Sequence, residues 1–414
     1  MQELDTDIRG REDLYDALDR YALERRVEID KRDLGADKGL IKSYVLETTD
    51  HDGEADIPAA LAGTSLRPER LGDDNAFRLM RGERHFGYAE PLGGRYLALH
   101  TYVQNTDADR AVLRLVEGSA DLDALWLAGD TFQQVLRQMI APESPQRNVI
   151  MKFEYAPQFA GGQTLIDWAT DDDERQWATS PDATGLDERV DADRRVASLM
   201  ERARRLDRTL PRYQEIEPVW RAVKTMRIPG VEHGGYDLYS WGKMTYRAPS
   251  FRGGRGWLRD ITTAYERVTR AIEELVWLRA EPAPGNAAFV LRGLPVVCQF
   301  GHPLPDATFR GFVENTFERG QSAFRFWGNP IPLGERKVHV YALDLHLWQP
   351  LYMELTPKQF VFILPEGTCG NTVHRLMTNL QRFVDPAVTM AIGDTDYATL
   401  VADAIAGRKV PGGR

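Results

Sequence analysis

Residues 242–278 read G-K-M-T-Y-R-A-P-S-F-R-G-G-R-G-W-L-R-D-I-T-T-A-Y-E-R-V-T-R-A-I-E-E-L-V-W-L. We expect a strand over residues 243–248 and a loop over residues 250–256, which hold three glycines and two arginines. After the loop, apolar residues follow one face of a 3.6-residue helix, namely Trp257, Ile261, Val268, Ile272 and Leu275. The stretch therefore predicts a strand, a glycine-arginine loop and a long helix near the start of a second domain.

The length of 414 residues predicts two domains, because one hydrophobic core rarely serves so long a chain. We expect an N-terminal α+β domain over residues 1–155, whose strand-like runs, residues 111–116 among them, are separated by turn-rich segments. Residues 156–235 are predicted to be a polar linker with a charged amphipathic helix at 190–210, ended by Pro211. A C-terminal α+β domain is expected over 236–405, and residues 406–414 are expected to be a flexible tail.

The second domain shows helical and strand-like segments in alternation, with neighbouring strands in its middle. Strands are predicted at residues 287–292, 322–327, 337–348 and 359–364, and helices at 306–319 and 370–383. This order favours helices packed on an antiparallel or mixed sheet. The fold class expected for the chain is therefore α+β, with two such domains.

The composition of the chain is that of a folded protein without a membrane-spanning segment. Hydrophobic residues make up 43% and charged residues 28%, which is typical of a folded domain, and no run approaches the roughly 20 apolar residues that cross a bilayer. We therefore expect no membrane partner.

The start of the sequence and its cysteine content bear on the compartment. The acidic start M-Q-E-L-D-T-D does not resemble a secretion signal, and two cysteines in 414 residues fit a reducing compartment. The large excess of arginine over lysine suggests a GC-rich bacterial genome, so a cytoplasmic bacterial protein is expected.

The glycine-arginine loop is the first candidate binding site. Unpaired backbone N–H groups at a helix start attract anions, and three arginines strengthen that field. The predicted anion-binding set is Arg252, Gly253, Gly254, Arg255 and Arg259. The sequence lacks the glycine spacing of a nucleotide-binding loop, so the alternative is a plain turn with solvent-facing arginines.

The second candidate is a zinc site. Both cysteines and four of the eight histidines fall between residues 298 and 374. Two Cys-His pairs at short spacing, Cys298 with His302 and Cys369 with His374, would supply four zinc ligands. The alternative is that both cysteines are buried without a metal.

The third candidate is a magnesium-dependent nuclease site. Asp306 follows a proline, and Glu335 and Lys337 stand at the head of a predicted strand. In such a site the two carboxylates bind Mg²⁺ and the lysine steadies the attacking water. The alternative is that Asp306 caps the helix predicted to begin there.

The fourth candidate is a cysteine nucleophile. Cys369 precedes a predicted helix, whose N-terminal field would lower the pKa of its thiol, and His339 or His346 would act as the base. Strand alternation places Asp344 and His346 on one face and His339 on the other. The alternative is that Cys369 is a small residue at a helix entry.

No catalytic signature stands out in the sequence, which favours a non-enzymatic role without excluding an enzyme. We expect a component of a cytoplasmic bacterial multi-protein assembly, for which a conflict or antiviral defence system is one setting. Other proteins are the expected partners. The alternative is a metal-dependent nuclease or nucleic-acid-binding protein that acts through its C-terminal domain.

Overall fold

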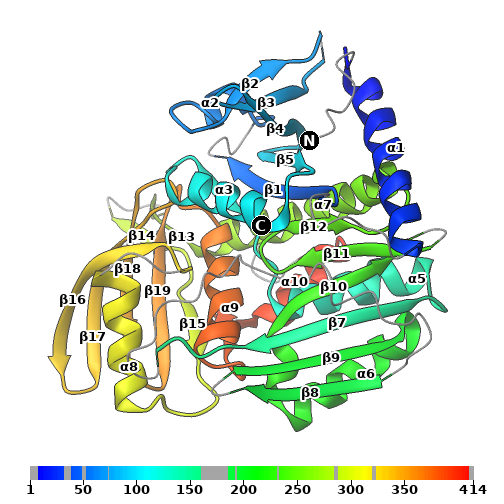
Figure 1. The fold of residues 1–414 in the computed structure, drawn as a ribbon. Helices are drawn as coiled ribbons and strands as arrows, with labels where there is room; N and C mark the ends of the chain where they lie inside the picture. The colour runs from blue at the N-terminus through cyan, green and yellow to red at the C-terminus, as the bar shows by residue number, and fades with distance from the viewer. Residues whose placement is uncertain are drawn as a thin grey trace.

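The computed structural model describes residues 8–31, 39–48, 53–72, 74–159, 185–191, 194–230, 233–283, 288–318 and 323–409. It is an α+β fold with two domains, each built on a mostly antiparallel sheet (Figure 1). The predicted fold class is confirmed.

The first domain is organised by a long antiparallel sheet. Its strands are β1 (Lys42–Thr48), β2 (Arg67–Arg70), β3 (Phe77–Arg81), β4 (Arg84–Gly93), β5 (Tyr96–Thr101), β6 (Leu122–Ala124), β7 (Asn148–Tyr155), β8 (Gly185–Asp191), β9 (Arg194–Arg202), β10 (Val223–Pro229), β11 (Gly235–Tyr239) and β12 (Lys243–Tyr246). Their order is β2-β3-β4-β5-β1-β12-β11-β10-β7-β9-β8, with β6 paired to β1. Strands from both ends of this segment therefore meet at the centre, where β1 pairs with β12.

Helices cover both faces of the first sheet. They are α1 (Arg11–Asp30), α2 (Ile57–Ala60), α3 (Asn105–Glu117), α4 (Gly129–Val135), a π-helical turn (Leu136–Ile140), α5 (Ala141–Glu143), α6 (Ala203–Ile216) and a 3₁₀ turn (Pro218–Arg221). Buried residues of α1, α4 and α6 share one core with β7, β10 and β12, whereas those of α2 and α3 share a second core with β1, β3 and β5. The sheet is thus buried between two hydrophobic layers.

The second domain contains a smaller sheet with helices packed against it. Its strands are β13 (Trp277–Pro282), β14 (Phe289–Arg292), β15 (Val296–Gln299), β16 (Phe326–Gly334), β17 (Lys337–Asp344), β18 (Gln349–Leu355), β19 (Gln359–Pro365), β20 (Thr389–Ile392) and β21 (Thr395–Asp396). The main order is β16-β17-β18-β19-β15-β20-β21, and β13 joins β19 in parallel while pairing with β14. The associated helices are α8 (Asp306–Val313), a π-helical turn (Glu314–Glu318), α9 (Asn371–Phe383) and α10 (Tyr397–Ile405).

Helix α7 (Phe251–Val276) belongs to both domains. Phe251, Leu258 and Ile261 in its first half lie in the first-domain core. Val268 and Ile272 in its second half lie in the core of the second domain. The two domains are therefore connected by one continuous helix.

The expected boundary at residue 236 differs from the observed sheet. Tyr236 pairs with Ile228 of β10 on one side and Tyr246 of β12 on the other, so the first sheet continues to residue 246. The expected linker over 156–235 also contains β8, β9, α6 and β10, while residues 160–184 lie outside the described residues. A segment that contributes three strands to a sheet is part of the domain and not a linker.

The helix predicted over residues 190–210 is wrong in its first part. Residues 194–202 form β9, which pairs with β7 along its length, and the helix α6 begins only at Ala203. Ala197 and Leu199 are buried while their neighbours are more exposed, which is the alternation of a strand. Pro211 lies inside α6 and does not end it.

The predicted glycine-arginine loop is the first turn of α7. The Ser250 side chain accepts a hydrogen bond from the Gly253 N–H at 3.1 Å, which caps the helix. Gly254 faces the tyrosine rings of Tyr236 and Tyr246, so its lack of a side chain allows α7 to lie directly on β11 and β12.

Two glycines of this turn give a matched pair of variants. A Cβ at Gly254 would lie 2.4 Å from a ring carbon of Tyr246, so Gly254→Ala should lower the free energy of unfolding by about 1–3 kcal/mol. A Cβ at Gly256 meets nothing within 4 Å, so Gly256→Ala should raise that free energy by up to about 1 kcal/mol. Urea unfolding measures both values, and equal shifts for the two variants would contradict the packing of α7 on the tyrosines.

Candidate functional site

Helix α9 is buried on all sides at the junction of the two domains. Figure 1 shows it between the strands of the second sheet and those of the first. Each of its 13 residues is buried, although eight of them are polar or charged. Buried polar groups need hydrogen-bond partners. Those of α9 find many partners in the first domain, where Asn371 donates to the Ala124 carbonyl and Gln381 accepts from the Gly129 N–H.

Arg375 of α9 joins the two domains through buried ion pairs. Its Nη1 donates to Asp123 Oδ2 of β6, and its Nη2 donates to Asp344 Oδ1 of β17 at 2.5 Å. Arg325 donates to the other Asp123 oxygen at 3.1 Å and to the Leu122 carbonyl at 2.7 Å. Burial alone would raise the pKa of Asp123, but Arg375 and Arg325 lower it to about 2. Asp123 is therefore an ionised carboxylate shared by two arginines of the second domain.

A second group of ion pairs lies near the start of α9. Arg95 Nε is 2.6 Å from Glu47 Oε1, and Arg95 Nη2 donates to Glu273 Oε1 of α7 at 2.7 Å. Glu273 Oε1 also accepts from the Gly370 N–H at 2.9 Å. Arg95 and Glu47 come from the first domain, so this group also crosses the junction.

Three potential metal ligands lie beside these ion pairs, and one of them, Glu47, belongs to the second group. One donor atom each of Glu47, His346 and Cys369 lies within 4.8 Å of the other two, and all three residues are buried. We call these residues the buried trio. Burial raises the pKa of Glu47 to about 7, lowers that of His346 to about 3 and raises that of the Cys369 thiol. The trio therefore combines a carboxyl group, a neutral imidazole and a neutral thiol in the protein interior.

The β17–β18 hairpin positions His346. Asp344 and Gln349 form the last pair of the two strands, and the connecting residues 345–348 enter the junction. The His346 N–H donates to Asp344 Oδ1 at 2.9 Å, and the Leu347 N–H donates to the Ala120 carbonyl of the first domain at 2.8 Å. Leu347 and Trp348 have φ values of 66° and 52°, which are unfavourable for side chains of this size. The hydrogen bonds of this loop therefore hold His346 in place directly before two residues with strained backbone.

The structure brings together part of the predicted nucleophile pair. Cys369 and His346 lie side by side in the trio, whereas His339 lies on the opposite side of β17 with Glu354. Asp344 and His346 are both buried, but the strand predicted over residues 337–348 ends at Asp344 and residues 345–348 form a turn, so strand alternation does not place His346. However, burial raises the pKa of the Cys369 thiol instead of lowering it. A neutral thiol in this position is not an activated nucleophile.

The four predicted zinc ligands do not gather at one place. Cys298 lies in the core on β15, His302 is exposed, and His374 is hydrogen-bonded to Tyr397 and Thr269. Among the described residues, the group of three or more metal-binding side chains is the buried trio, to which Cys369 contributes. The sequence therefore pointed to Cys369 as a potential ligand, but its neighbours in the structure are Glu47 and His346 instead of the predicted His374 and Cys298.

The predicted nuclease residues lie on the surface of the second domain. Asp306 is the first residue of α8 and lies 3.2 Å from Arg336 Nε, without capping the helix through its side chain. Glu335 is exposed in the turn between β16 and β17, and Lys337 Nζ is 2.8 Å from Glu354 Oε2. The two predicted segments are thus neighbours, with ion-pair partners for Asp306 and Lys337.

The predicted anion site is in contact with carboxylates of the chain itself. The Arg252 N–H donates to Asp19 Oδ1 of α1 at 3.0 Å, and the Arg252 side chain pairs with three acids of that helix. Arg255 donates two hydrogen bonds to Glu90, at 2.6 and 2.8 Å, and Arg259 lies beside Asp260. Although burial opposes it, hydrogen bonds from His100 and Arg255 lower the pKa of Glu90 to about 2. The carboxylates that contact Arg252 and Arg255 at the helix start therefore belong to α1 and β4.

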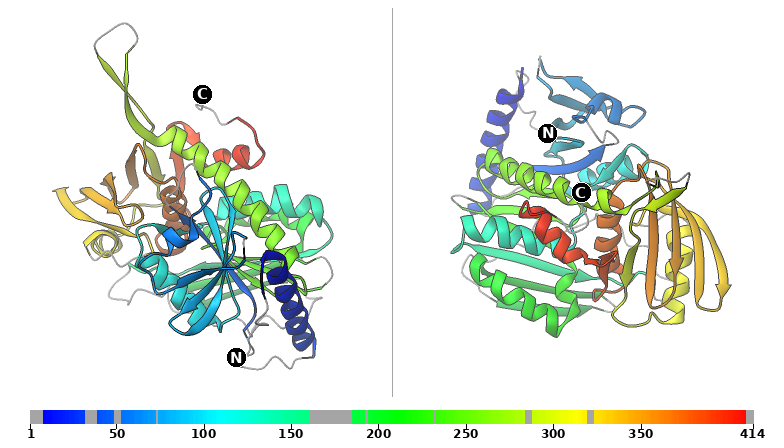
Figure 2. Two further views of the ribbon diagram at one scale, coloured as in Figure 1. Left: turned by 90° about the horizontal axis from the view of Figure 1, so that it is seen from above. Right: turned by 180° about the vertical axis from the view of Figure 1, so that it is seen from behind.

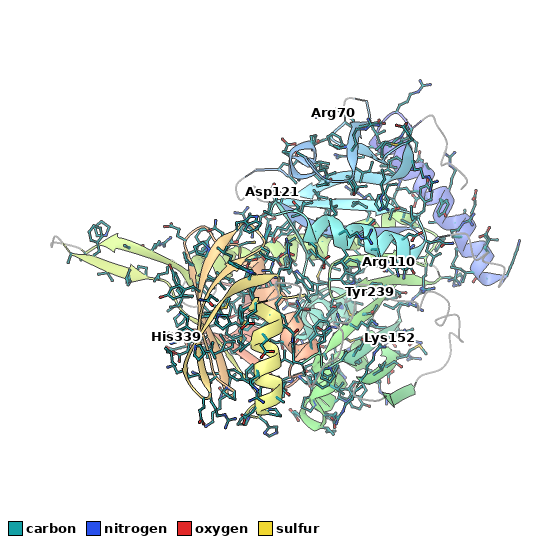
Figure 3. All side chains as sticks on the ribbon, turned by 60° about the vertical axis from the view of Figure 1, so that its left-hand side comes forward. Arg70, Arg110, Asp121, Lys152, Tyr239 and His339 are labelled. Carbon is teal, nitrogen blue, oxygen red and sulfur yellow. The ribbon has the colours of Figure 1, made fainter. Side chains whose placement is uncertain are left out.

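A largely apolar surface lies on the side of the second sheet opposite α8. We call it the outer face and define it by Trp327, Ile331, Tyr341, Leu343, Tyr352 and Ile363 of β16–β19. Tyr341 is 63% exposed, Trp327 52% and Tyr352 44%, and the two tyrosine rings lie edge to face at 5.4 Å. Lys337 and His339, on the same side of β17, are both 2.8 Å from Glu354. Figure 3 shows His339 on this sheet, away from Lys152 and Tyr239 of the first sheet.

The β13–β14 hairpin projects from the second domain, as Figure 2 shows in the view from above. All four residues of β14 are exposed, and Phe289 and Leu291 are exposed by 71% and 69%. This hairpin is a second place where large apolar side chains meet solvent.

Comparison with known proteins identifies the family. The family model described as MJECL33-like protein matches residues 2–160 and 235–399. The chain belongs to the MJECL33-like family. The uncharacterized protein MJECL33 of Methanocaldococcus jannaschii is 21% identical over 411 residues, covering 93% of this chain and 95% of its own. No solved structure matches the chain significantly.

The residues matched by the MJECL33-like model include all of the junction described above. Glu47, Asp123, His346, Cys369 and Arg375 fall inside the two matched segments, whereas β8, β9 and α6 fall outside them. None of the helices in the described part of the chain is long and apolar enough to cross a membrane.

Sequence reasoning missed most of the junction residues. Glu47, Asp123 and Arg375 each lie in an otherwise apolar or uncharged run, such as V-L-E-T for Glu47 and L-D-A-L-W-L for Asp123. A lone charge in a run that is predicted to be buried is a signal for a buried ion pair. Its partner is distant in sequence, so the pairing itself was not predictable.

Asp123 and its neighbour Asp121 test the ion network. Asp123→Asn should lower the free energy of unfolding by about 3–5 kcal/mol, because Arg375 and Arg325 would lose their shared charge in the interior. Asp121 is exposed, so Asp121→Asn should change the value by less than about 0.5 kcal/mol. Denaturant unfolding followed by circular dichroism measures both, and a small loss for Asp123→Asn would contradict the role given to this carboxylate.

Proposed function

We propose that this MJECL33-like chain is a non-enzymatic component of a cytoplasmic multi-protein assembly. The outer face is the proposed contact surface for a partner protein. The observation that carries this proposal is the row of exposed aromatic side chains across β16, β17 and β18. Tyrosine and tryptophan are enriched among the interface residues that contribute most of the binding free energy. Their rings bury a large area with little loss of conformational freedom.

The charge of the outer face favours a protein partner over a nucleic acid. Its basic groups Lys337 and His339 both contact Glu354, so no basic cluster is left to bind phosphates. The chain as a whole carries a formal charge of −10, which opposes non-specific binding of nucleic acid. The expected partner surface is therefore apolar and close to neutral.

A metal-dependent nuclease is the second candidate. It is supported by the contact between Arg336 and Asp306, which brings the start of α8 next to the turn that contains Glu335. In this proposal Asp306 and Glu335 bind Mg²⁺ while Lys337 steadies the attacking water, as the sequence predicts. The ion pairs of Asp306 and Lys337 would have to open for this chemistry.

Surface variants test the assembly proposal. Trp327→Ser with Tyr341→Ser should reduce recovery of a stoichiometric partner protein in a native pull-down by at least about tenfold, since a loss of 1.4 kcal/mol in binding has that effect. Leu23→Ser with Ile216→Ser is the matched control, because it removes two exposed apolar residues from the first domain. The control should retain the partner, and mass spectrometry compares the two.

Equal recovery of all partners with both double variants would contradict a contact through the outer face. Half of each sample is treated with nuclease before the pull-down, so that proteins held only through nucleic acid are lost. Nucleic acid recovered without a protein partner, together with Mg²⁺-dependent cleavage that Glu335→Ala abolishes, would establish the second candidate instead.

A further inference from the structure

We infer that the buried trio of Glu47, His346 and Cys369 binds one divalent metal ion of the zinc class. This inference is independent of the proposed function, because the trio lies at the domain junction and not on the outer face. It also differs from the zinc site expected from the sequence, which shares only Cys369 with it.

The spacing of the donor atoms fits an ion. Three atoms at most 4.8 Å apart can all lie about 2.8 Å from a common centre. Zinc bonds to sulfur, nitrogen and carboxylate oxygen are about 2.0–2.3 Å long, so each donor would move inward by about 0.5–0.8 Å. Side-chain rotation supplies movements of this size without a change of fold.

Unpartnered polar atoms point to the same place. Glu47 Oε2 and both ring nitrogens of His346 have no hydrogen-bond partner, although their residues are at most 1% exposed. Such atoms are rare in folded proteins because each one loses its hydration without compensation. An ion bound by Glu47 and His346 would give each of these side chains the missing partner.

The charges around the trio balance when an ion is bound. Four acids lie in the two ion-pair groups, Glu47, Asp123, Glu273 and Asp344, against three arginines, Arg95, Arg325 and Arg375. When the four acids and three arginines are all ionised and His346 and Cys369 are neutral, the cluster carries one negative charge. A divalent ion that binds the Cys369 thiolate and releases its proton to solvent adds one positive charge, which makes this cluster neutral.

The donor set selects the type of ion. Magnesium and calcium prefer oxygen ligands, whereas a thiolate and an imidazole suit zinc and the neighbouring transition metals. Asp123 Oδ2 lies 3.9 Å from His346 Nδ1, which is beyond hydrogen-bond distance, so a shift of the ring toward Asp123 would be needed for this carboxylate to orient a metal-bound histidine. Three protein ligands leave the fourth position of a tetrahedral ion to water or another small ligand.

The ion would also link the two domains. Glu47 belongs to β1 of the first domain, whereas His346 and Cys369 belong to the second. Binding therefore adds a cross-link beside the ion pairs of Arg375 and Arg95. It should stabilise the folded chain by an amount that grows with the logarithm of the free ion concentration once the site is saturated.

The two cysteines provide a matched test in the full-length protein. Chelator-stripped wild type and Cys298→Ser should each take up one equivalent of Zn²⁺ or Co²⁺, and the Co²⁺ form should show the near-ultraviolet absorption of a thiolate bond. Cys369→Ser should lose this absorption, and His346→Gln should bind at least about 100-fold more weakly. Metal analysis, absorbance and circular dichroism measure stoichiometry, ligation and folding.

A melting experiment keeps the test decisive if Cys369→Ser does not fold. Added Zn²⁺ should raise the melting temperature of the wild type and of Cys298→Ser, but not that of His346→Gln. Folded wild type that takes up no Zn²⁺ or Co²⁺ would overturn the inference, and so would loss of the absorption in Cys298→Ser. Binding that survives in both Cys369→Ser and His346→Gln would likewise place the ion elsewhere.

Discussion

The carboxylate of Asp123, held between Arg375 and Arg325, is the interaction on which the junction of the two domains depends. Ions in a protein interior are costly to desolvate, and their attraction offsets this cost only when the geometry and hydrogen bonds are complete. Arg375 meets this condition, since its guanidinium contacts Asp123, Asp344 and the Phe324 carbonyl. The pairing therefore fixes the position of α9 relative to β6 more strictly than apolar packing alone.

Other features of the junction follow from this placement. With α9 fixed, Gly370 lies against Glu273 and the Cys369 thiol lies beside Glu47. Asp344 accepts from Arg375 and also from the His346 N–H, so the same ion network holds the strained hairpin loop. The buried trio is thus assembled by the ion pairs around it. The outer face lies on the other side of the second sheet, which separates the proposed partner contact from the proposed metal site.

Local periodicity predicted much of the C-terminal half of the chain but not the junction. The strand near residue 243, helix α7, strands β17 and β19 and helix α9 all have clear alternating or helical patterns, and the structure contains each of them. Residues 111–116 were expected to be a strand because of their branched and apolar side chains, yet they lie in α3, where tertiary packing outweighs intrinsic preference. The β1–β12 pairing joins segments about 200 residues apart, so no local pattern could reveal that the first sheet continues past residue 236. Cys369 was recognised as a candidate ligand from its residue type. Its neighbour Glu47 and the burial that raises the pKa of the Cys369 thiol depend on contacts distant in sequence, so neither was predicted.

The buried ion pairs that cross the junction should make the two domains one cooperative unit. Native-state hydrogen exchange in increasing denaturant tests this most directly, because it reports the opening free energy of each segment. Amides of α9 and β19 in the second domain should exchange through the same global opening as those of β1 in the first. Opening of α9 and the second sheet at a clearly lower free energy, with β1 still protected, would contradict this cooperativity.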